Sequence, residues 1–436
     1  MMDTLATMPK YEAYKESNVD RIGEIPKHWN VIKLKFCTKI NAFSLPERTP
    51  NSFMLQYVDI GSVSFENGIE KTEEFIFEDA PSRARRLAKT GDVVVSTVRT
   101  YLKAISSIDD ESENYIYSTG FAVISPKPEM KPAFLSNFIK SNAFTEQVDL
   151  VAKGMSYPAI NSTELSNLYS LEVPEAEQEA IFKYLDRKTA QLNEAITIKE
   201  KQIALLKEHK QIIIQKAVTQ GLNPDAPMKD SGVDWIRQIP EHWEVKRLKY
   251  VLEERSERSR TGEEPLFMVS QIHGLVVRAD FHDKAAVAAS NVDNKIVYKN
   301  DLVFNKLKAH LGVFFKSNIE FKGLVSPDYA VYRCKAHIVD AKLLELLFRH
   351  PSYIEQFIIR ATGIVEGLIR LYTGDLFDIS VPIAPENEQL EILAHIEKQS
   401  KTFDRAVDLQ QRQIEKLKEY KTTLINSAVT GKIKVA

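Results

Sequence analysis

Basic side chains are concentrated in two segments of the chain, and each segment contains a single acid. The first, residues 80–103, surrounds Asp92 and carries Arg83, Arg85, Arg86, Lys89, Arg99 and Lys103. The second, residues 295–316, surrounds Asp301 and carries Lys295, Lys299, Lys306, Lys308 and Lys316. Because the formal net charge of the whole chain is only −2, two such local concentrations indicate contact with a polyanion at two places. Ordinary solvated surface charge is the alternative interpretation.

Side chains that can recognise base edges lie among these cations. In the major groove of DNA, Arg and Lys can bond to guanine and Asn to adenine, whereas Lys more often holds phosphate. A turn at residues 153–158, matched by residues 360–364, adds a glycine that permits close approach of the backbone. On charge and position, the predicted DNA contacts are Thr97, Arg99, Tyr101, Lys103, Ser156 and Tyr157 in the first half, and Asn305, Lys306, Lys308, His310, Thr362 and Arg370 in the second.

The sequence lacks the common motifs of catalysis and cofactor binding. G-x-x-x-x-G-K-[ST], G-x-G-x-x-G, H-E-x-x-H and G-x-S-x-G do not occur, nor does the Asn/Asp-Pro-Pro-aromatic element of amino-methyltransferases. Glu-x-Lys triplets are frequent in a chain rich in both residues, and Glu320-Phe-Lys322, in an expected strand, has the most plausible setting for a metal-dependent nuclease. Cys334 and His337 have a ligand-like spacing, but one pair cannot hold a metal ion. We therefore predict no catalytic residue, cofactor or metal site in this chain.

A five-residue motif occurs twice, as IPKHW from Ile25 and as IPEHW from Ile239. In the 22-residue windows that begin at Tyr14 and Met228, 12 positions are identical. Further along, Asp92 aligns with Asp301 at the head of a predicted strand, and Pro-Glu-x-Glu-Gln occurs at residues 174–178 and 385–389. The chain is therefore an internal duplication, and we interpret the two His-Trp pairs as packing anchors.

The two copies agree at framework positions but differ at the candidate contact positions. The first copy has Ser96, Thr97 and Tyr101 in the segment where the second copy has Asn305 and His310. Two related readers with different side chains indicate a bipartite, asymmetric target.

Each copy ends in a long amphipathic helix. Seam positions recur mostly in alternating steps of three and four from Ile181 to Ala217, and again from Ile392 to Ala428. Most of these positions are apolar, and the polar ones are Lys188, Lys199 and Lys210 in the first stretch and Gln399, Gln410 and Lys421 in the second. A straight helix over the first stretch would be roughly 55 Å long. Because the two stripes are equivalent in spacing and length, we expect the helices to pair with each other as a rigid spacer; packing of each helix on its own globular domain is the alternative.

The predicted organisation is α+β, with two homologous globular domains and two long helices. The boundaries are residues 14–175 for the first domain, 176–219 for the first helix, 220–227 for a linker, 228–385 for the second domain and 387–431 for the second helix. Shorter helices are expected at residues 131–150 and 340–360. Composition (44% hydrophobic, 27% charged), two cysteines, no apolar run long enough to cross a bilayer and no secretory signal predict a cytoplasmic protein.

The ordered motifs resemble the specificity subunit of a Type I restriction-modification system over essentially the whole chain. The resemblance is carried by D-x-I-x-x-I-P-x-H-W, a variable α/β segment, P-E-x-E-Q and a long helix ending L-K-E-x-K-x-x-x-I-x-x-A-V-T, all present twice. It implies two target recognition domains in a pseudo-twofold arrangement, with the helices as an antiparallel coiled coil. It further implies a non-catalytic subunit that binds double-stranded DNA and docks two methyltransferase subunits.

In that family the partners, and not this chain, use S-adenosylmethionine to methylate adenine N6, and a motor subunit uses ATP and Mg²⁺ to translocate and cut DNA. Three alternatives remain open. One is the specificity subunit of a modification system without a motor. The second is a self-contained modification or cleavage enzyme, which would need a cofactor motif. The third is a coiled-coil scaffold that binds no DNA, which would leave the paired basic segments unexplained.

Overall fold

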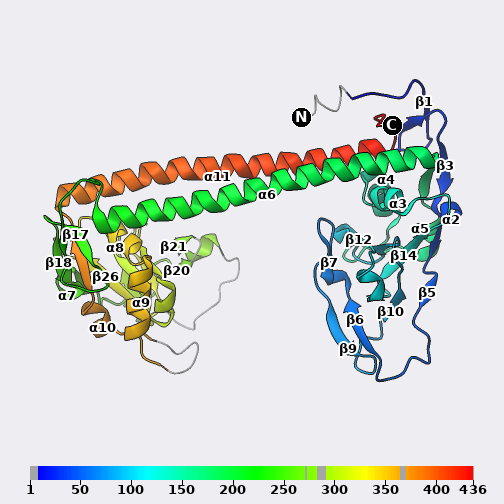
Figure 1. Cartoon of the computed structure of the whole chain (residues 1–436). Coiled ribbons are helices and arrows are strands. Elements are labelled where there is room, and N and C mark those ends of the chain that lie inside the picture. The colour runs from blue at the N-terminus through cyan, green and yellow to red at the C-terminus, as the bar shows by residue number, and fades with distance from the viewer. Residues whose placement is uncertain (1–7, 271–272, 282–290, 364–369, 436) are drawn as a thin grey trace. The chain divides into compact units, whose positions relative to one another are not determined.

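The computed structural model describes residues 8–270, 273–281, 291–363 and 370–435 (Figure 1). Contacts divide the chain into two units, one of Met1–Glu200 with Gln411–Ala436 and the other of Lys201–Gln410. Each unit therefore contains one globular part and one half of each of two long helices, α6 (Glu175–Gln220) and α11 (Glu386–Val429). Among the described residues, no helix is long and apolar enough to cross a membrane.

A four-stranded antiparallel sheet is the centre of the first unit. Its order is β12 (Ile105–Ser107), β11 (Val93–Ser96), β14 (Phe121–Pro126) and β4 (Thr38–Ile40). Successive side chains of a strand point to opposite faces, and Val93 and Val95 of β11 pack in one hydrophobic cluster while Val94 packs in another. The run of valines is therefore explained by a strand that is buried on both faces.

The second unit repeats this sheet with the same order of equivalent strands. They are β24 (Phe314–Lys316), β23 (Leu302–Asn305), β26 (Tyr329–Cys334) and β19 (Leu252–Glu254). Leu302 and Phe304 of β23 pack in one cluster and Val303 in another, as in β11. The strands that were expected after Asp92 and Asp301 are thus confirmed.

The two units differ beyond this sheet. The first has a five-stranded sheet in the order β5 (Phe43–Ser44), β10 (Ala84–Leu87), β13 (Ile116–Ser118), β6 (Met54–Val58) and β9 (Glu73–Ile76), and a short pair of β7 (Val63–Ser64) with β8 (Gly68–Ile69). In the second unit, two separate pairs are described: β20 (Phe267–Ser270) with β21 (Gly274–Val277), and β22 (Lys295–Val297) with β25 (Gly323–Val325). Short 3-10 turns accompany these strands at η1 (Ile60–Ser62), η3 (Ser112–Asn114) and η4 (Arg278–Asp280).

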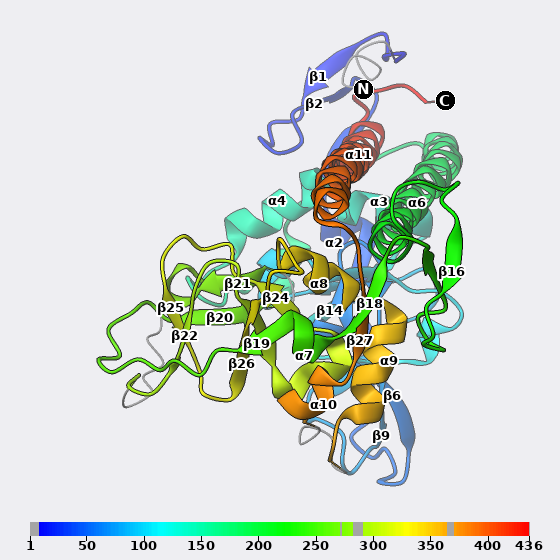
Figure 2. The same ribbon diagram turned by 90° about the vertical axis from the view of Figure 1, so that its left-hand side faces the viewer.

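Short strand pairs and single helical turns frame each unit in equivalent positions. In the first unit these are β1 (Tyr14–Glu16) with β2 (Glu24–Pro26), β3 (Asn30–Lys33) with β15 (Tyr169–Glu172), and the turns α2 (Leu34–Cys37) and α5 (Ser162–Ser166). In the second they are β16 (Met228–Asp230) with β17 (Gln238–Pro240), β18 (Glu244–Arg247) with β27 (Ser380–Ile383), and the turns α7 (Leu248–Val251) and α10 (Thr373–Phe377). Figure 2 shows β18 and β27 side by side, next to α7.

The single helices expected at 131–150 and 340–360 are each two helices. The first stretch forms α3 (Pro132–Ile139) and α4 (Asn142–Val151), because Ser141 adopts an extended conformation between them. The second forms α8 (Lys342–Leu347) and α9 (Pro351–Arg360), with His350 extended before Pro351. A proline favours the first turn of a new helix and disfavours helical geometry in the residue before it, which explains the second break.

Within each unit the long helices run antiparallel and contact each other (Figure 1). In the first unit Lys421 of α11 donates to Asn193 of α6 at 2.8 Å, and Lys199 of α6 donates to Gln413 at 2.5 Å. In the second, Lys210 pairs with Asp404 at 2.7 Å. The apolar positions of both helices join the core of each unit, for example Ile181 and Leu424 in the first.

Candidate nucleic-acid interface

The two repeated motifs of each half contact one another and fix the start of the long helix. Trp29 is fully buried, and its indole Nε1 donates to Glu177 Oε2 at 3.1 Å in the first turn of α6. In the second unit Trp243 Nε1 donates to Glu388 Oε2 at 3.0 Å. His28 and His242 contact the same carboxylates at 2.6 and 2.7 Å. The predicted packing anchor is confirmed, and its partner is the Pro-Glu-x-Glu-Gln motif.

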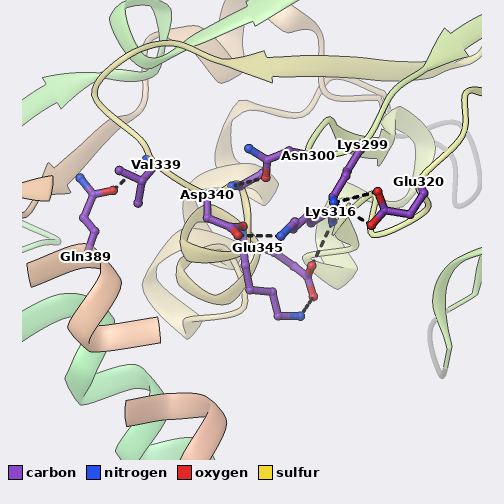
Figure 3. A network of polar contacts seen from close by, with 10 residues as sticks. Lys299, Asn300, Lys316, Glu320, Val339, Asp340, Glu345 and Gln389 are labelled. Atoms are coloured by element: carbon purple, nitrogen blue, oxygen red, sulfur yellow. Dashed lines mark hydrogen bonds and ion pairs between the residues drawn. The ribbon is translucent and has the colours of Figure 1, made fainter. Parts of the chain in front are cut away.

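The next residue of that motif ties the helix to the globular part. Gln178 Oε1 accepts from the backbone N–H of Lys131 at 2.8 Å, just before α3. Gln389 accepts from Val339 N–H at 3.1 Å, just before α8 (Figure 3). The candidate contact loops are thus carried on a framework that is bonded to the long helices in the same way in both units.

In the first unit, the central strand β11 leads into the predicted contact loop. Residues 97–103 follow the strand and include the short 3-10 turn η2 (Thr100–Leu102). Arg99 and Lys103, which flank this turn, have φ values of 54° and 47°. Non-glycine residues seldom adopt this left-handed conformation and persist in it where the surroundings impose it, often at functional sites.

The segment after α4 is bonded to this loop. Ile160 N–H donates to Thr97 O at 2.8 Å, Thr100 N–H donates to Pro158 O at 3.3 Å, and Val98 bridges Ala159. The guanidinium of Arg99 lies 5.0 Å from the ring centre of Tyr157, a distance typical of a cation–π contact. The structure therefore brings Thr97 and Arg99 close to Tyr157, although Tyr157 follows Thr97 by 60 residues in the chain.

The other predicted residues of the first unit vary in exposure. Tyr101 is 56% exposed, and Ser156 is also exposed. Lys103 is half-buried, and its ammonium reaches Thr145 of α4 at 3.4 Å, so it points toward the helix. The tip of the 153–158 turn is Met155, which is fully exposed and is not among the residues predicted from the sequence, because charge and polarity guided that prediction.

The second unit places its predicted residues in the equivalent elements. Asn305 ends β23, and Lys306, Lys308 and His310 lie in η5 (Lys306–Leu311). The backbone of Leu371 donates to Lys306 O at 3.1 Å. Thr362 and Arg370 exchange two backbone hydrogen bonds of 2.9 and 2.8 Å, so the loop after the strand again meets the segment after the second helix. The side chain of His310 lies outside the described residues.

Within the described ranges, the cations of the first basic segment have no carboxylate partners. Among the described residues, none of Arg83, Arg85, Arg86, Lys89, Arg99 and Lys103 takes part in an ion pair. They do not form one continuous patch, however. Arg83 lies near the contact loop, since its carbonyl accepts from Thr119 and Gly120 O accepts from Thr97. Lys89 lies at the opposite end of β11, 4.5 Å from the ring centre of Phe43.

The lysines of the second basic segment are mostly neutralised by acids that are distant in sequence. Lys295 and Lys306 are both paired with Glu254 of β19, at 3.4 and 3.5 Å. Lys316 pairs with Asp340 at 2.6 Å and Lys299 with Glu320 at 2.7 Å (Figure 3). Burial, followed by the nearby Lys306, lowers the pKa of Lys295. The charge counted along the second segment therefore overstates the positive charge that it presents at the surface.

Two of the predicted contacts in the second unit are affected by this pairing. The Lys306 side chain is only 16% exposed, and Arg370 donates to Asp328 at 3.0 Å. Lys308 is exposed and, in the described part of the chain, has no carboxylate partner. Any phosphate contact by Lys306 would have to compete with Glu254.

Asp92 and Asp301 are structural residues. Asp92 accepts from the backbone N–H of Lys89 at 2.9 Å, and Asp301 accepts from Tyr298 N–H at 2.8 Å, so both close the turn before the central strand. Burial raises the pKa of both carboxyl groups. In the second unit Arg255 also bonds Asp301 with two donors, at 2.8 and 3.0 Å.

The residues weighed for metal-dependent chemistry have a structural explanation. Glu320 and Lys322 precede β25 and do not lie in the strand that was expected there. They pair with Lys299 and Glu264 respectively. Among the residues that the structure describes, no group of three or more His, Cys, Asp or Glu is placed to hold a metal ion.

The chain is similar over nearly its full length to known restriction-system proteins. No protein-family model matches it. A putative type I restriction enzyme MjaX specificity subunit of Methanocaldococcus jannaschii is 25% identical over 97% of this chain and 98% of its own length.

Two solved structures share the fold. A chain from work on complex assembly and conformational transition of the type I R-M system aligns with a TM-score of 0.68 at 21% identity, covering 93% of this chain and 98% of that one. The HsdS subunit of Thermoanaerobacter tengcongensis aligns with a TM-score of 0.50 at 21% identity, covering 94% and 98%. With the same framework motifs bonded in the same way in both units, the chain is thus similar over nearly its whole length to a type I restriction enzyme specificity subunit, and it shares the fold of the two solved chains.

Proposed function

We propose that this chain is the subunit that reads a bipartite, asymmetric DNA target for a methyltransferase or restriction complex. One observation carries the proposal. Each unit presents a loop after its central strand, bonded to the segment after its second helix, and the two loop pairs have different side chains on equivalent frameworks. Arg99 and Tyr157 meet in one unit, and Asn305, Lys308 and Arg370 occupy the corresponding elements of the other.

The proposed division of the chain is that of the sequence prediction. Residues 14–175 and 228–385 are target recognition domains in a pseudo-twofold arrangement, and residues 176–219 and 387–431 are spacer helices that form an antiparallel coiled coil. The contacts of α6 with α11 inside each unit support this arrangement. The helices would set the spacing between the two half-sites and carry two methyltransferase subunits.

In this proposal the chain has no catalytic role of its own. S-adenosylmethionine, ATP and Mg²⁺ would be bound by the methyltransferase and motor subunits. An adenine must leave the base stack to be methylated, so the task of this chain is to place the partner's active site over the correct base.

The test is co-expression with the methyltransferase subunit encoded beside it, followed by mapping of N6-methyladenine across the host genome. We expect a split, asymmetric motif that is absent when the chain is omitted. Replacing residues 14–175 with the domain of another specificity subunit should change one half of the motif and preserve the other half. A soluble, assembled complex that adds no methylation would contradict the proposal and favour a scaffold.

A further inference from the structure

The turn of residues 153–158 holds one apolar side chain in a fixed, exposed position. Lys153 and Ala159 exchange two backbone hydrogen bonds of 2.9 Å, which close the turn. Gly154 has a φ of +113°, and a Cβ there would lie 2.9 Å from Tyr157 O, so this tight path requires glycine. Met155 follows at the tip, and its side chain is fully exposed.

The turn is not an independent appendage, because it is bonded to the contact loop on its other side. The hydrogen bonds from Ile160 to Thr97 and from Thr100 to Pro158 join the two segments, and Arg99 lies against Tyr157. A side chain at the tip is therefore positioned by the same framework that positions the predicted polar contacts.

The surroundings of Met155 combine apolar and cationic groups. Tyr157 and Leu102 are exposed apolar neighbours in the two joined segments. Arg99 and Lys153 are exposed cations, and the ammonium of Lys153 pairs with Glu164 at 2.8 Å. An exposed apolar tip two residues from the ring that Arg99 contacts fits a ligand with an anionic outside and an apolar inside. Duplex DNA has both, in its phosphates and its stacked bases.

We propose that Met155 inserts among the bases of the half-site read by the first unit. This inference rests on the proposed function and adds a contact of a different kind from the polar ones. Arg99 would contact a phosphate, while the thioether of Met155 makes an apolar contact with bases or wedges between two of them, as Met, Phe and Leu do in proteins that kink DNA.

The test uses the complete chain assembled with its methyltransferase subunits, and a duplex that carries the motif found by methylation mapping. Binding is measured at about 50 mM and about 200 mM salt, on the motif duplex and on one with the first half-site scrambled. The variants are Met155→Ala and Met155→Leu, with Leu150→Ala as the matched control because Leu150 is an exposed apolar residue on neighbouring α4.

We expect Met155→Ala to weaken binding to the motif duplex about tenfold, the loss typical of one base contact, and to leave the scrambled duplex unaffected. The salt dependence should not change, because no charge is removed. Met155→Leu should restore most of the affinity, and Leu150→Ala should bind like the wild type. A 2-aminopurine placed in the first half-site should brighten on binding of the wild type, because its stacking is disturbed, and brighten less with Met155→Ala.

Unchanged binding by Met155→Ala, or an equal loss on both duplexes, would overturn the inference and leave the proposed function intact. A wild-type complex that does not distinguish the two duplexes would instead overturn the proposed function. The two failures are therefore separable.

Discussion

At the scale of single residues, each long helix is anchored by a carboxylate that accepts from a buried tryptophan. Glu177 accepts from Trp29, contacts His28 and accepts from Tyr11 at 2.8 Å. Burial alone would raise the pKa of Glu177, but the bonds from His28, Tyr11 and Trp29 outweigh it and lower the pKa below its usual value. The charged form is therefore favoured in the folded protein.

This anchor predicts a pH-dependent loss of stability in Glu177→Gln. A carboxyl group whose pKa is lowered by folding stabilises the protein above its unfolded pKa of about 4.3, and this stabilisation is lost as the pH falls through the folded value. We expect a loss of about 2 kcal/mol at pH 7, the scale of a charge-assisted hydrogen bond, that shrinks as the pH falls through the lowered pKa of Glu177. Urea unfolding of the variant and the wild type at pH 3 to 7 measures it.

The matched control is Glu175→Gln, which removes another carboxylate from the first turn of α6. Glu175 is exposed, and its one ion pair within the described part of the chain is with Lys131 at the surface, so Glu175→Gln should cost less stability than Glu177→Gln at every pH. If both variants lowered the free energy of unfolding equally, the loss would come from the helix dipole. The bond between Glu177 and Trp29 would then make no contribution of its own.

A second residue-scale prediction concerns the buried Asp301. Arg255→Met removes both donors to this carboxylate, and we expect a loss of roughly 3 kcal/mol at pH 7 because a buried charge is left without its partner. Since burial already raises the pKa of Asp301, its protonation on acidification should reduce the deficit as the pH falls. Arg21→Met, which removes an exposed pair with Glu146, is the control and should cost less than about 1 kcal/mol.

At the scale of elements, the two contact loops occupy equivalent places but differ in electrostatics. Acids on β19 and before α8 neutralise the lysines of the second unit. Among the described residues, the cations of residues 83–103 take part in no such ion pair, so the first unit should provide most of the phosphate contacts. Arg83→Ala and Arg99→Ala should each reduce the slope of log affinity against log salt concentration by about 0.9, the value for one phosphate contact on duplex DNA.

The control for this prediction is Lys299→Ala, because Glu320 already neutralises Lys299 at the surface. Its slope should equal that of the wild type when the assembled complex is titrated with duplex DNA. Equal reductions from Lys299→Ala and Arg99→Ala would show that the ion pairs of the second unit open on binding. They would contradict the prediction that the first unit makes most of the phosphate contacts.

At the scale of the whole molecule, the duplication predicts how the target changes when the halves are made alike. A chain in which residues 228–385 are replaced by residues 14–175 should direct methylation to a symmetric motif, with the first half-site repeated in inverted orientation. The reason is that antiparallel helices would present two identical readers in opposite directions. Methylation mapping of the co-expressed complex tests this, and a direct repeat would exclude the proposed pseudo-twofold arrangement.

The sequence by itself determined the features that depend on residues close together in the chain. The duplication, the strands after Asp92 and Asp301 and the long amphipathic helices follow from short motifs and periodicity. The helix break before Pro351 has a local signal, the proline itself, although the prediction ran a single helix through residues 340–360. The break at Ser141 has no proline. The candidate loops were found because their basic and polar residues lie within a few positions of one another in the chain.

The tertiary structure alone decided which of those side chains are occupied by other residues of the chain and which are available to contact a ligand. Lys306 meets Glu254 from a strand 52 residues earlier, and Thr97 meets Ile160 from a segment 63 residues later. Coulomb attraction and hydrogen bonding depend on distance in space, so a count of charges along the chain cannot reveal this pairing. The exposure of Met155 has the same origin: a single methionine usually packs in a core, and only the closed turn at Gly154 places this one in solvent.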